Sequence, residues 1–228
     1  MGLKSPDVKI GTAGLPMPGY QIDVLNSDGK VLGPNKLGSI AVKMPLPPGT
    51  LPTLWNADER FRKAYLSKFP GYYETGDAGT IDQEGYVSIM ARTDDVINTA
   101  GHRLSTGAME EVLAEHPDIA ECAVIGVKDE LKGQVPIGFV CLNDGVNRDP
   151  ADIVAETIIS VRDKIGPVAS FKTAIIIERL PKTRSGKILR GTMLKIANGE
   201  DFTAPATIDD VNILEEIKES LIKIGYPR

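Results

Sequence analysis

The sequence predicts an α+β fold, in which a β-rich part is followed by a compact part that mixes helices and strands. Up to about residue 93, apolar residues alternate with polar ones between Gly and Pro turns, which is typical of strands. After residue 93, apolar residues recur at helical spacing between short β-branched runs. The 228 residues, 42% hydrophobic and 25% charged, suit a soluble protein of two small domains, which we place at 1–93 and 94–228.

The β-rich part shows strand and turn signals in a regular order. Residues 20–24 alternate apolar and polar side chains, and Asp28-Gly29 is a strong hairpin-turn signal. A further strand at 38–43 is expected to end at the prolines of 45–49, because proline cannot occupy a central strand. The remaining expected elements are a helix within 56–69 and strands near 79–81 and 86–89.

The second part is expected to alternate helices and strands. Thr106 is the expected N-cap of a helix that ends before Pro117. Asp149 can cap another helix, with Pro150 at its first position. The other expected elements are a strand pair at 121–127 and 136–142, a β-branched strand at 172–178, and terminal helices near 188–197 and 211–224.

Charge and cysteine content narrow the classes of function. The net charge of −5 argues against a nucleic-acid binder, which needs a basic surface to displace counterions from phosphate. Cys122 and Cys141 are too few for a disulfide framework or a zinc site and are expected to be buried thiols. No targeting segment follows Met1 and no membrane-spanning run is found, so the residues alone indicate a cytoplasmic, reducing environment.

The segment LPKTRSGKILR (180–190) contains Gly186-Lys187, a pair that also occurs in phosphate loops. A phosphate loop requires G-x-x-x-x-G-K-[ST], and both Pro181 and Ile188 violate that pattern. What remains is a flexible turn that holds Lys187 just before a helix. The lysine is either a mobile cation for an anionic ligand or an exposed surface residue.

Two further segments carry charge next to turns. ARTDDVINTAGHRLST (91–106) gathers acids, arginines and a histidine around Gly101 between a strand and a helix, which fits a hinge or ligand loop and equally a solvated connection. In YYETGDAG (72–79), Asp77 follows Gly76 at the start of a strand. There its carboxylate can either accept two hydrogen bonds from a ribose diol or cap a turn.

In this order and at this spacing, the segments resemble the acyl-CoA synthetases of the adenylate-forming, AMP-binding superfamily. LPKTRSGK and DDVIN-x-x-GHR carry most of the resemblance, and GTAGLPMPGY (11–20), YYETGDAG and VRDKIGP (161–167) match as well. The chain looks most similar to the short-chain acetyl/propionyl-CoA synthetase group, and within it to the mitochondrial, propionate-preferring branch.

The resemblance implies a reaction in two steps. A carboxylate attacks the α-phosphate of ATP to give an acyl-adenylate and diphosphate, and coenzyme A then displaces AMP. The implied small molecules are ATP with Mg²⁺, coenzyme A, and acetate or propionate. Residues 1–93 would be the last β-subdomain of the large domain, a distorted barrel remnant, and 94–228 the mobile lid. The mitochondrial matrix and lipid or fatty acid metabolism are the implied setting, without a nucleic-acid or membrane partner.

The resemblance also implies roles for individual residues. Lys187 would be the catalytic lysine, and the lid would turn about Asp94. The residues expected to contact ATP or AMP are Asp77 at the ribose, Arg92 at the nucleotide and Arg103 on the phosphate side. Those expected to contact coenzyme A are Arg162 and the backbone at Ala100 and Gly101. The metal ligands are unknown: relatives can hold a cation through carbonyls near His116, but a lone histidine at a helix end is more often structural.

The family's Thr/Ser/Gly-rich phosphate loop, its adenine-binding segment and its acyl pocket are expected to precede residue 1. We therefore expect this chain to be the C-terminal portion of a longer enzyme and to be inactive alone. One alternative is a non-catalytic lid that associates with a full-length synthetase or is regulated by acylation of Lys187, which removes its charge. Another is a superfamily member with a different acceptor, as in luciferase-like or peptide-synthetase domains, although DDVINTAGHRLST and VRDKIGP argue against it.

Overall fold

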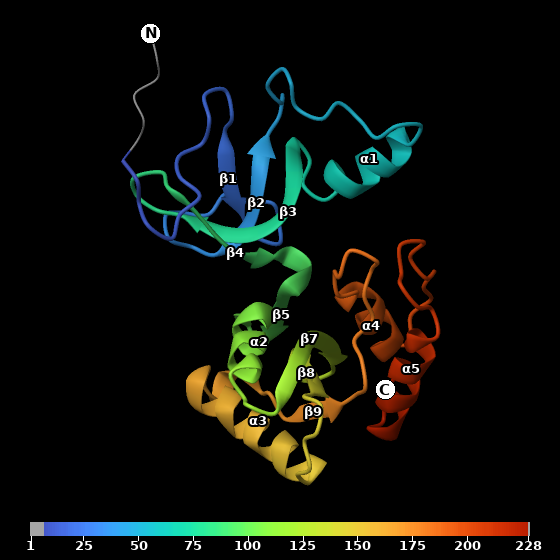
Figure 1. The fold of residues 1–228 in the computed structure, drawn as a ribbon. Coiled ribbons are helices and arrows are strands. Elements are labelled where there is room, and N and C mark those ends of the chain that lie inside the picture. Colours follow the sequence, from blue (N-terminus) through green and yellow to red (C-terminus); the bar gives the residue numbers. More distant parts are fainter. Residues whose placement is uncertain (1–6, 228) are drawn as a thin grey trace. The chain divides into compact units, whose positions relative to one another are not determined.

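The computed structural model describes residues 7–227, apart from the side chain of Asp94. The chain divides into two compact units, Met1–Thr93 and Asp94–Arg228, coloured blue to green and green to red in Figure 1. Each unit combines a β-sheet with helices, so the predicted α+β class is confirmed. None of the helices within residues 7–227 is long and apolar enough to cross a membrane.

The first unit is built on a four-stranded antiparallel sheet in the order β1-β2-β3-β4. Its described strands form an open sheet and do not close into a barrel, so only the β-rich character of the expected barrel remnant is found. As predicted, the second strand ends before the prolines that begin at Pro45. The third strand is longer than expected. The strands are β1 (Ile22–Leu25), β2 (Gly38–Lys43), β3 (Tyr72–Ile81) and β4 (Val87–Arg92).

Aromatic rings hold the helix of the first unit against its sheet. Helix α1 (Asp58–Tyr65) lies within the predicted range and buries Phe61. The ring of Tyr65 stacks on that of Tyr73 in β3, with 5.2 Å between centroids and 3° between planes. The ring of Phe61 lies 5.4 Å from Tyr65. Aromatic pairs of this kind stabilise beyond the apolar area they bury, so α1 is anchored at one end of β3.

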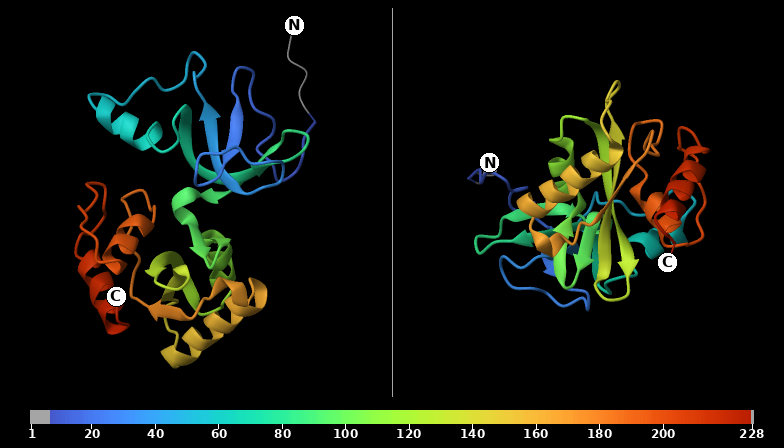
Figure 2. Two further views of the ribbon diagram at one scale, coloured as in Figure 1. Left: turned by 180° about the vertical axis from the view of Figure 1, so that it is seen from behind. Right: turned by 90° about the horizontal axis from the view of Figure 1, so that it is seen from below.

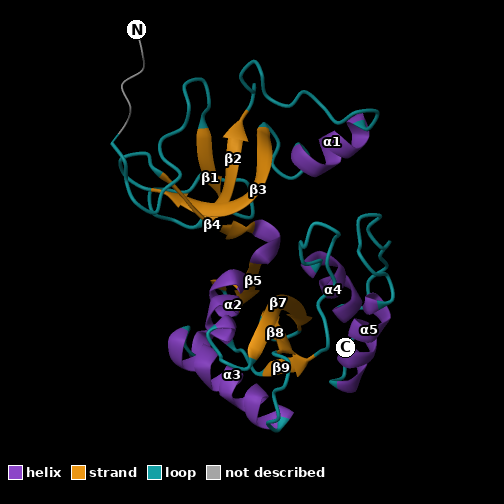
Figure 3. Cartoon of the chain, in the orientation of Figure 1, coloured by secondary structure: helices purple, strands orange, loops and turns teal. Residues whose placement is uncertain are grey.

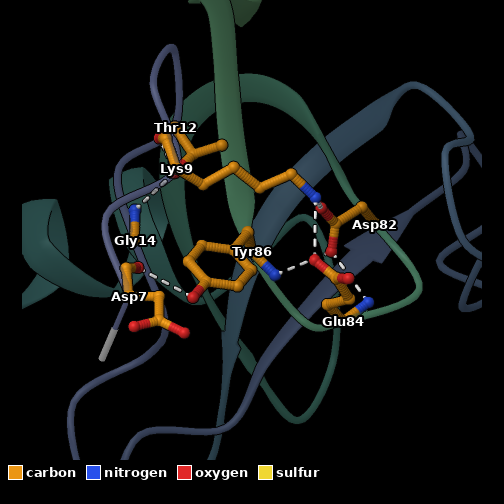
Figure 4. Close-up of polar contacts among 7 residues, drawn as sticks. All are labelled: Asp7, Lys9, Thr12, Gly14, Asp82, Glu84 and Tyr86. Carbon is orange, nitrogen blue, oxygen red and sulfur yellow. Dashed lines mark hydrogen bonds and ion pairs between the residues drawn. The ribbon is translucent and has the colours of Figure 1, made fainter.

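A lysine fastens the start of the described chain to the turn between β3 and β4 (Figure 4). Lys9 Nζ lies 2.5 Å from Asp82 Oδ2 and 3.0 Å from Glu84 Oε2, and 5.3 Å above the ring of Tyr86. The Tyr86 hydroxyl donates to the carbonyl of Asp7 at 2.8 Å. Hydrogen bonds to the two carboxylates raise the pKa of Lys9 to about 12. These contacts hold the start of the described chain close to β4. The segment that follows, residues 13–17, helps to line a cavity there.

The second unit is built on a mixed five-stranded sheet in the order β6-β5-β8-β7, with β9 parallel to β8. The predicted strand pair is confirmed as a long antiparallel hairpin of β7 and β8. The predicted β-branched strand is shorter than expected. The strands are β5 (Val96–Thr99), β6 (His102–Ser105), β7 (Ile119–Asp129), β8 (Gly133–Leu142) and β9 (Thr173–Ile176).

Helices cover both faces of this sheet, as Figures 2 and 3 show. Alternation along β7 explains the two layers: Ala123 and Ile125 enter the core under α4 and α5, whereas Val124 enters the core under α2 and α3. The helices are α2 (Thr106–Ala114), α3 (Pro150–Lys164), α4 (Arg190–Ala197) and α5 (Ile213–Lys223), with short 3₁₀ turns η1 (Thr93–Asp95) and η2 (Pro167–Ala169).

The caps of α2 and α3 test the sequence reasoning directly. The Asp149 side chain accepts a hydrogen bond from the Ala151 N–H at 2.9 Å, with Pro150 at the first helical position, as predicted. The predicted N-cap of α2 is wrong by one residue. Ser105 is the cap, because its hydroxyl accepts from the Ala108 N–H, and Thr106 is the first helical residue.

The two cysteines behave as poorly reactive thiols. Cys141 is buried, as predicted, whereas Cys122 is only half-buried. Burial raises the pKa of each thiol to about 11. Because the thiolate is the reactive form, neither residue suits nucleophilic chemistry near neutral pH.

Candidate functional site

Asp77 and Arg92 lie side by side in the first unit, on β3 and β4. Arg92 Nη1 is 3.6 Å from Asp77 Oδ1 and donates to the carbonyl of Thr75 at 3.2 Å. Gly76 makes this approach possible: a Cβ there would lie 2.6 Å from Arg92 Nη2, and its φ is +79°. The structure thus brings together two residues that the sequence placed in separate motifs. Asp77 sits within β3 and not at the start of a strand, which corrects the sequence reading.

An apolar cavity of about 340 Å³ opens beside Asp77. Its walls come from the segment that follows Lys9 and from all four strands of the sheet, and Thr75 and Asp77 are its polar residues besides Tyr20. The apolar lining residues are Ala13, Gly14, Leu15, Pro16, Met17, Ile22, Ile40, Val87 and Ile89. Mostly apolar walls with a few fixed polar groups are typical of small-molecule sites.

Residues 96–105 form a hairpin where the sequence indicated a charged loop, so that expectation is corrected. Strands β5 and β6 pair antiparallel, and the turn between them is Ala100-Gly101. Both turn residues have positive φ, +49° for Ala100 and +85° for Gly101. That combination defines the hairpin turn whose twist matches the strands. Alanine is uncommon in this conformation, which explains why the turn was missed.

The remaining residues of this motif lie on either side of the turn. Arg103 is exposed on β6, opposite Asn98. The backbone of Asp94 belongs to η1 at the start of the second unit, and its side chain lies outside the described residues. The hairpin therefore presents the Ala100-Gly101 backbone at its tip and an arginine two residues further on.

Thr99, next to this turn, has a fully buried hydroxyl with no hydrogen-bond partner in the described structure. A buried polar group without a partner costs about 1–3 kcal/mol. Valine has the same shape without the hydroxyl. We therefore expect Thr99→Val to raise the free energy of unfolding by about 1–2 kcal/mol, measured by urea denaturation.

Thr157 provides the matched control for this prediction. It is also buried, but its hydroxyl donates to the carbonyl of Val154 at 2.7 Å. Thr157→Val should leave stability unchanged or lower it. A loss of stability in Thr99→Val would show that the Thr99 hydroxyl has a partner that stabilises the fold.

Lys187 closes a tight turn that precedes α4. The Thr183 N–H donates to the carbonyl of Lys187 at 2.8 Å, and the Lys187 N–H donates to Thr183 Oγ1 at 3.1 Å. Lys182 and Ile188 form a bridge at the base. The expected flexible turn is therefore held by hydrogen bonds, and the helix begins three residues later, at Arg190. The side chain of Lys187 is exposed and makes no ion pair with any described residue, so its charge is available.

Arg162 is exposed on the last turn of α3. No hydrogen bond or ion pair among residues 7–227 joins it to the Ala100-Gly101 turn or to Lys187. Arg162, the Ala100-Gly101 turn and Lys187 therefore all lie on the second unit, but Arg162 does not contact the other two through a hydrogen bond or an ion pair.

His116 has a structural role in the described chain. Its Nε2 lies 2.8 Å from Glu156 Oε2, and its Nδ1 accepts from the Asp118 N–H at 3.2 Å. Arg148 also binds Glu156 and, with His116, lowers the pKa of that carboxyl to about 2. Both ring nitrogens are thus occupied. Among the described residues, no group of three His, Cys, Asp or Glu side chains could hold a metal ion.

Sequence reasoning missed an ion pair that positions the Lys187 turn. Arg190, the last residue of LPKTRSGKILR, donates from Nε and Nη2 to the two carboxylate oxygens of Glu110, each at 2.8 Å. Glu110 Oε1 also accepts from the Val124 N–H. This pair ties the start of α4 to α2 and β7. Glu110 lies 80 residues away in sequence, and no local pattern marks it as the partner.

Comparison with known proteins identifies this part of the chain. Residues 108–187, from α2 to the lysine of the turn, match the family model described as the AMP-binding enzyme C-terminal domain. Residues 108–187 are an AMP-binding enzyme C-terminal domain. The resemblance inferred from the motifs is thereby confirmed.

Relatives extend the similarity beyond the AMP-binding C-terminal domain. The chain is 51% identical over 221 residues to an uncharacterized protein of Pseudomonas aeruginosa, covering 97% of this chain and 35% of that protein. It is 49% identical to acyl-CoA synthetase short-chain family member B, mitochondrial, of Dictyostelium discoideum, covering 92% and 30%. It is 40% identical to an acetyl-coenzyme A synthetase of Pyrobaculum aerophilum, covering 98% and 33%. The chain thus spans about a third of the length of these relatives.

Solved structures of adenylate-forming enzymes share the fold. Acetoacetyl-CoA synthetase from Streptomyces lividans has a TM-score of 0.78 at 24% identity, covering 96% of this chain and 33% of that chain. The o-succinylbenzoate CoA synthetase of Bacillus subtilis, in complex with its acyl-adenylate intermediate, has a TM-score of 0.63 at 28% identity, covering 80% and 35%. The homologues of this chain are acyl-CoA synthetases and related ligases.

Proposed function

We propose that this chain is the C-terminal part of an ATP-dependent short-chain acyl-CoA ligase. The reaction converts a carboxylate, ATP and coenzyme A into acyl-CoA, AMP and diphosphate through an acyl-adenylate. The observation that carries the proposal is that the match to the AMP-binding C-terminal domain includes Lys187, an exposed cation held on a hydrogen-bonded turn. The names of two relatives, a short-chain acyl-CoA synthetase and an acetyl-CoA synthetase, support the substrate class.

The chemistry of the residues supports distinct roles in binding the nucleotide. The carboxylate of Asp77, which lines the apolar cavity, can accept hydrogen bonds from a ribose diol. Arg92 lies against it and carries a planar fork of donors suited to phosphate or nucleotide oxygens. Arg103 would contact the nucleotide on its phosphate side. The ammonium of Lys187 would stabilise the negative charge that grows as the acyl carboxylate attacks the α-phosphate.

We propose that residues 1–93 are the final β-subdomain of the AMP-binding large domain and that 94–228 are its lid. The division of the chain between Thr93 and Asp94 supports this assignment. Asp94 would then be the hinge residue. Coenzyme A would meet the lid at Arg162 and at the backbone of Ala100 and Gly101. The exposed position of that turn at a hairpin tip is compatible with a ligand passing close to its backbone.

We propose that Mg²⁺ binds together with the nucleotide. Among the described side chains of residues 7–227, no group of three His, Cys, Asp or Glu could hold the ion. Mg²⁺ commonly binds through substrate phosphates with few protein ligands, so it would arrive as MgATP. The mitochondrial matrix, a role in fatty acid metabolism and the choice between acetate and propionate are proposals that rest on resemblance and on the names of relatives.

The test compares the chain alone with a chimera in which it replaces the matching segment of the Dictyostelium relative. We expect the purified chain to form no propionyl-CoA or acetyl-CoA, because the resemblance places the phosphate loop and acyl pocket elsewhere in the enzyme. We expect the chimera to form acyl-CoA, measured by chromatography of the thioester product. A folded chimera without activity would contradict the proposed function. Product from the chain alone, lost on Lys187→Ala, would contradict the expected dependence on the rest of the enzyme.

Association of the chain with a full-length synthetase is a separate proposal. A pull-down with the same relative tests it: stable association would favour an interaction module, and its absence would favour a catalytic fragment.

A further inference from the structure

Lys132 lies in the short loop between β7 and β8, which is fixed by a carboxylate. Asp129 Oδ1 accepts hydrogen bonds from the N–H groups of Leu131 and Lys132, at 3.1 and 2.9 Å. The side chain of Lys132 is half-buried. The loop therefore holds this lysine in a defined position on the second unit.

Two residues with unusual backbone conformation both contact Lys132. Ala100 and Ser170 have φ of +49° and +52°, and they are the non-glycine residues with positive φ in the described part of the second unit. The Ala100 N–H donates to the carbonyl of Lys132 at 2.8 Å. The ammonium of Lys132 donates to Ser170 Oγ at 2.8 Å. Such conformations are costly for non-glycine residues and gather at functional sites, so one lysine links two strained positions.

The ammonium of Lys132 has a neutral partner, which distinguishes it from the lysines of this unit that pair with carboxylates. Lys128 and Lys182 pair with Glu200 and Glu121. Lys132 makes its hydrogen bond to a hydroxyl and forms no ion pair with any residue whose side chain is described. A half-buried cation without a counter-charge is expected to attract an anionic ligand. Because Ser170 Oγ accepts from the lysine, its own O–H can donate to the same ligand.

We infer that Lys132 binds a phosphate group of coenzyme A, an inference that rests on the proposed function. The Ala100-Gly101 turn, where the pantetheine arm is proposed to pass, is hydrogen-bonded directly to the Lys132 backbone. The other end of coenzyme A carries phosphates, for which a lysine ammonium is a suitable point charge. Lys132 thus positions the turn through its carbonyl and holds the ligand through its ammonium.

The experiment measures binding of coenzyme A to the 228-residue chain by calorimetry at fixed salt. Lys132→Met removes the charge and keeps most of the side-chain volume, and we expect it to weaken binding by about tenfold or more, the loss typical of one charge-assisted hydrogen bond. Lys132→Arg should retain most of the affinity. Lys223→Met, at an exposed lysine at the end of α5, is the matched control and should bind like the native chain.

The outcomes separate this inference from the function on which it rests. If the native chain binds coenzyme A and Lys132→Met binds equally well, the role of Lys132 is wrong and the proposed function stands. If the native chain shows no saturable binding, the coenzyme A site on this unit is wrong, and the inference is overturned with it. Circular dichroism checks that each variant is folded, and Lys132→Gln replaces the methionine variant if that protein loses its native spectrum.

Discussion

Lys187→Ala in the chimeric synthetase should slow acyl-adenylate formation by about 100-fold or more, because loss of one donor that stabilises developing charge typically has this effect. An ammonium 4 Å from an anion near a protein surface interacts with about 4 kcal/mol. The turn around Lys187 is closed by two hydrogen bonds between Thr183 and the Lys187 backbone, so the backbone of the lysine is already ordered. Diphosphate release measures this step, and formation of acyl-CoA from a preformed acyl-adenylate should be much less affected.

Lys182→Ala is the matched control for this prediction. Lys182 lies at the base of the same turn, but its ammonium already pairs with Glu121 on the surface. Loss of a surface ion pair should change the stability of the protein little. Because the ammonium of Lys182 is already paired, the variant should also keep nearly native rates of both steps. If Lys187→Ala reduced both half-reactions equally, or neither, the assignment of Lys187 to adenylation would be wrong.

Local patterns predicted the elements whose causes are local. The Asp149-Pro150 start of α3 needs only one side chain and its own helix, and it was confirmed. The β7–β8 hairpin was found from its apolar runs. The hairpin at 96–105 was missed because its turn uses alanine with positive φ, where glycine or asparagine is the usual signal. Asp77 was placed at a strand start because Gly76 looks like a turn, whereas the glycine accommodates Arg92 inside β3.

Contacts between distant segments could not be predicted from one sequence. The motifs pointed to Asp77 and Arg92 separately, but only the pairing of β3 with β4 shows that they are neighbours. Lys132 carries no motif at all, and its relation to Ala100 and Ser170 depends on how three loops meet. Residue types identify the chemistry that is available, whereas topology decides which groups act together.

Arg190→Met should lower the free energy of unfolding of the second unit by about 2 kcal/mol, because hydrogen bonds to charged groups contribute about 1.5–3 kcal/mol and the half-buried carboxylate of Glu110 would lose its counter-charge. The side chains of Arg190 and Glu110 are 26% and 15% exposed, and two hydrogen bonds of 2.8 Å join them. Burial lowers the pKa of Arg190, but the hydrogen bond to Glu110 and the negative charges near the guanidinium, of which Glu110 is the first, together raise it above its ordinary value. Urea denaturation of the 228-residue chain measures the change.

Arg179→Met provides the control, because Arg179 binds Asp210 and Glu216 at the surface and its loss should change stability little. Adding Glu110→Gln to Arg190→Met should recover part of the lost stability, since the double variant no longer holds an unpaired, half-buried carboxylate. Equal stability of Arg190→Met and Arg179→Met would contradict the role of the Arg190–Glu110 pair. Because this pair fixes the start of α4, three residues after Lys187, the Arg190→Met chimera should also adenylate more slowly while retaining its catalytic lysine.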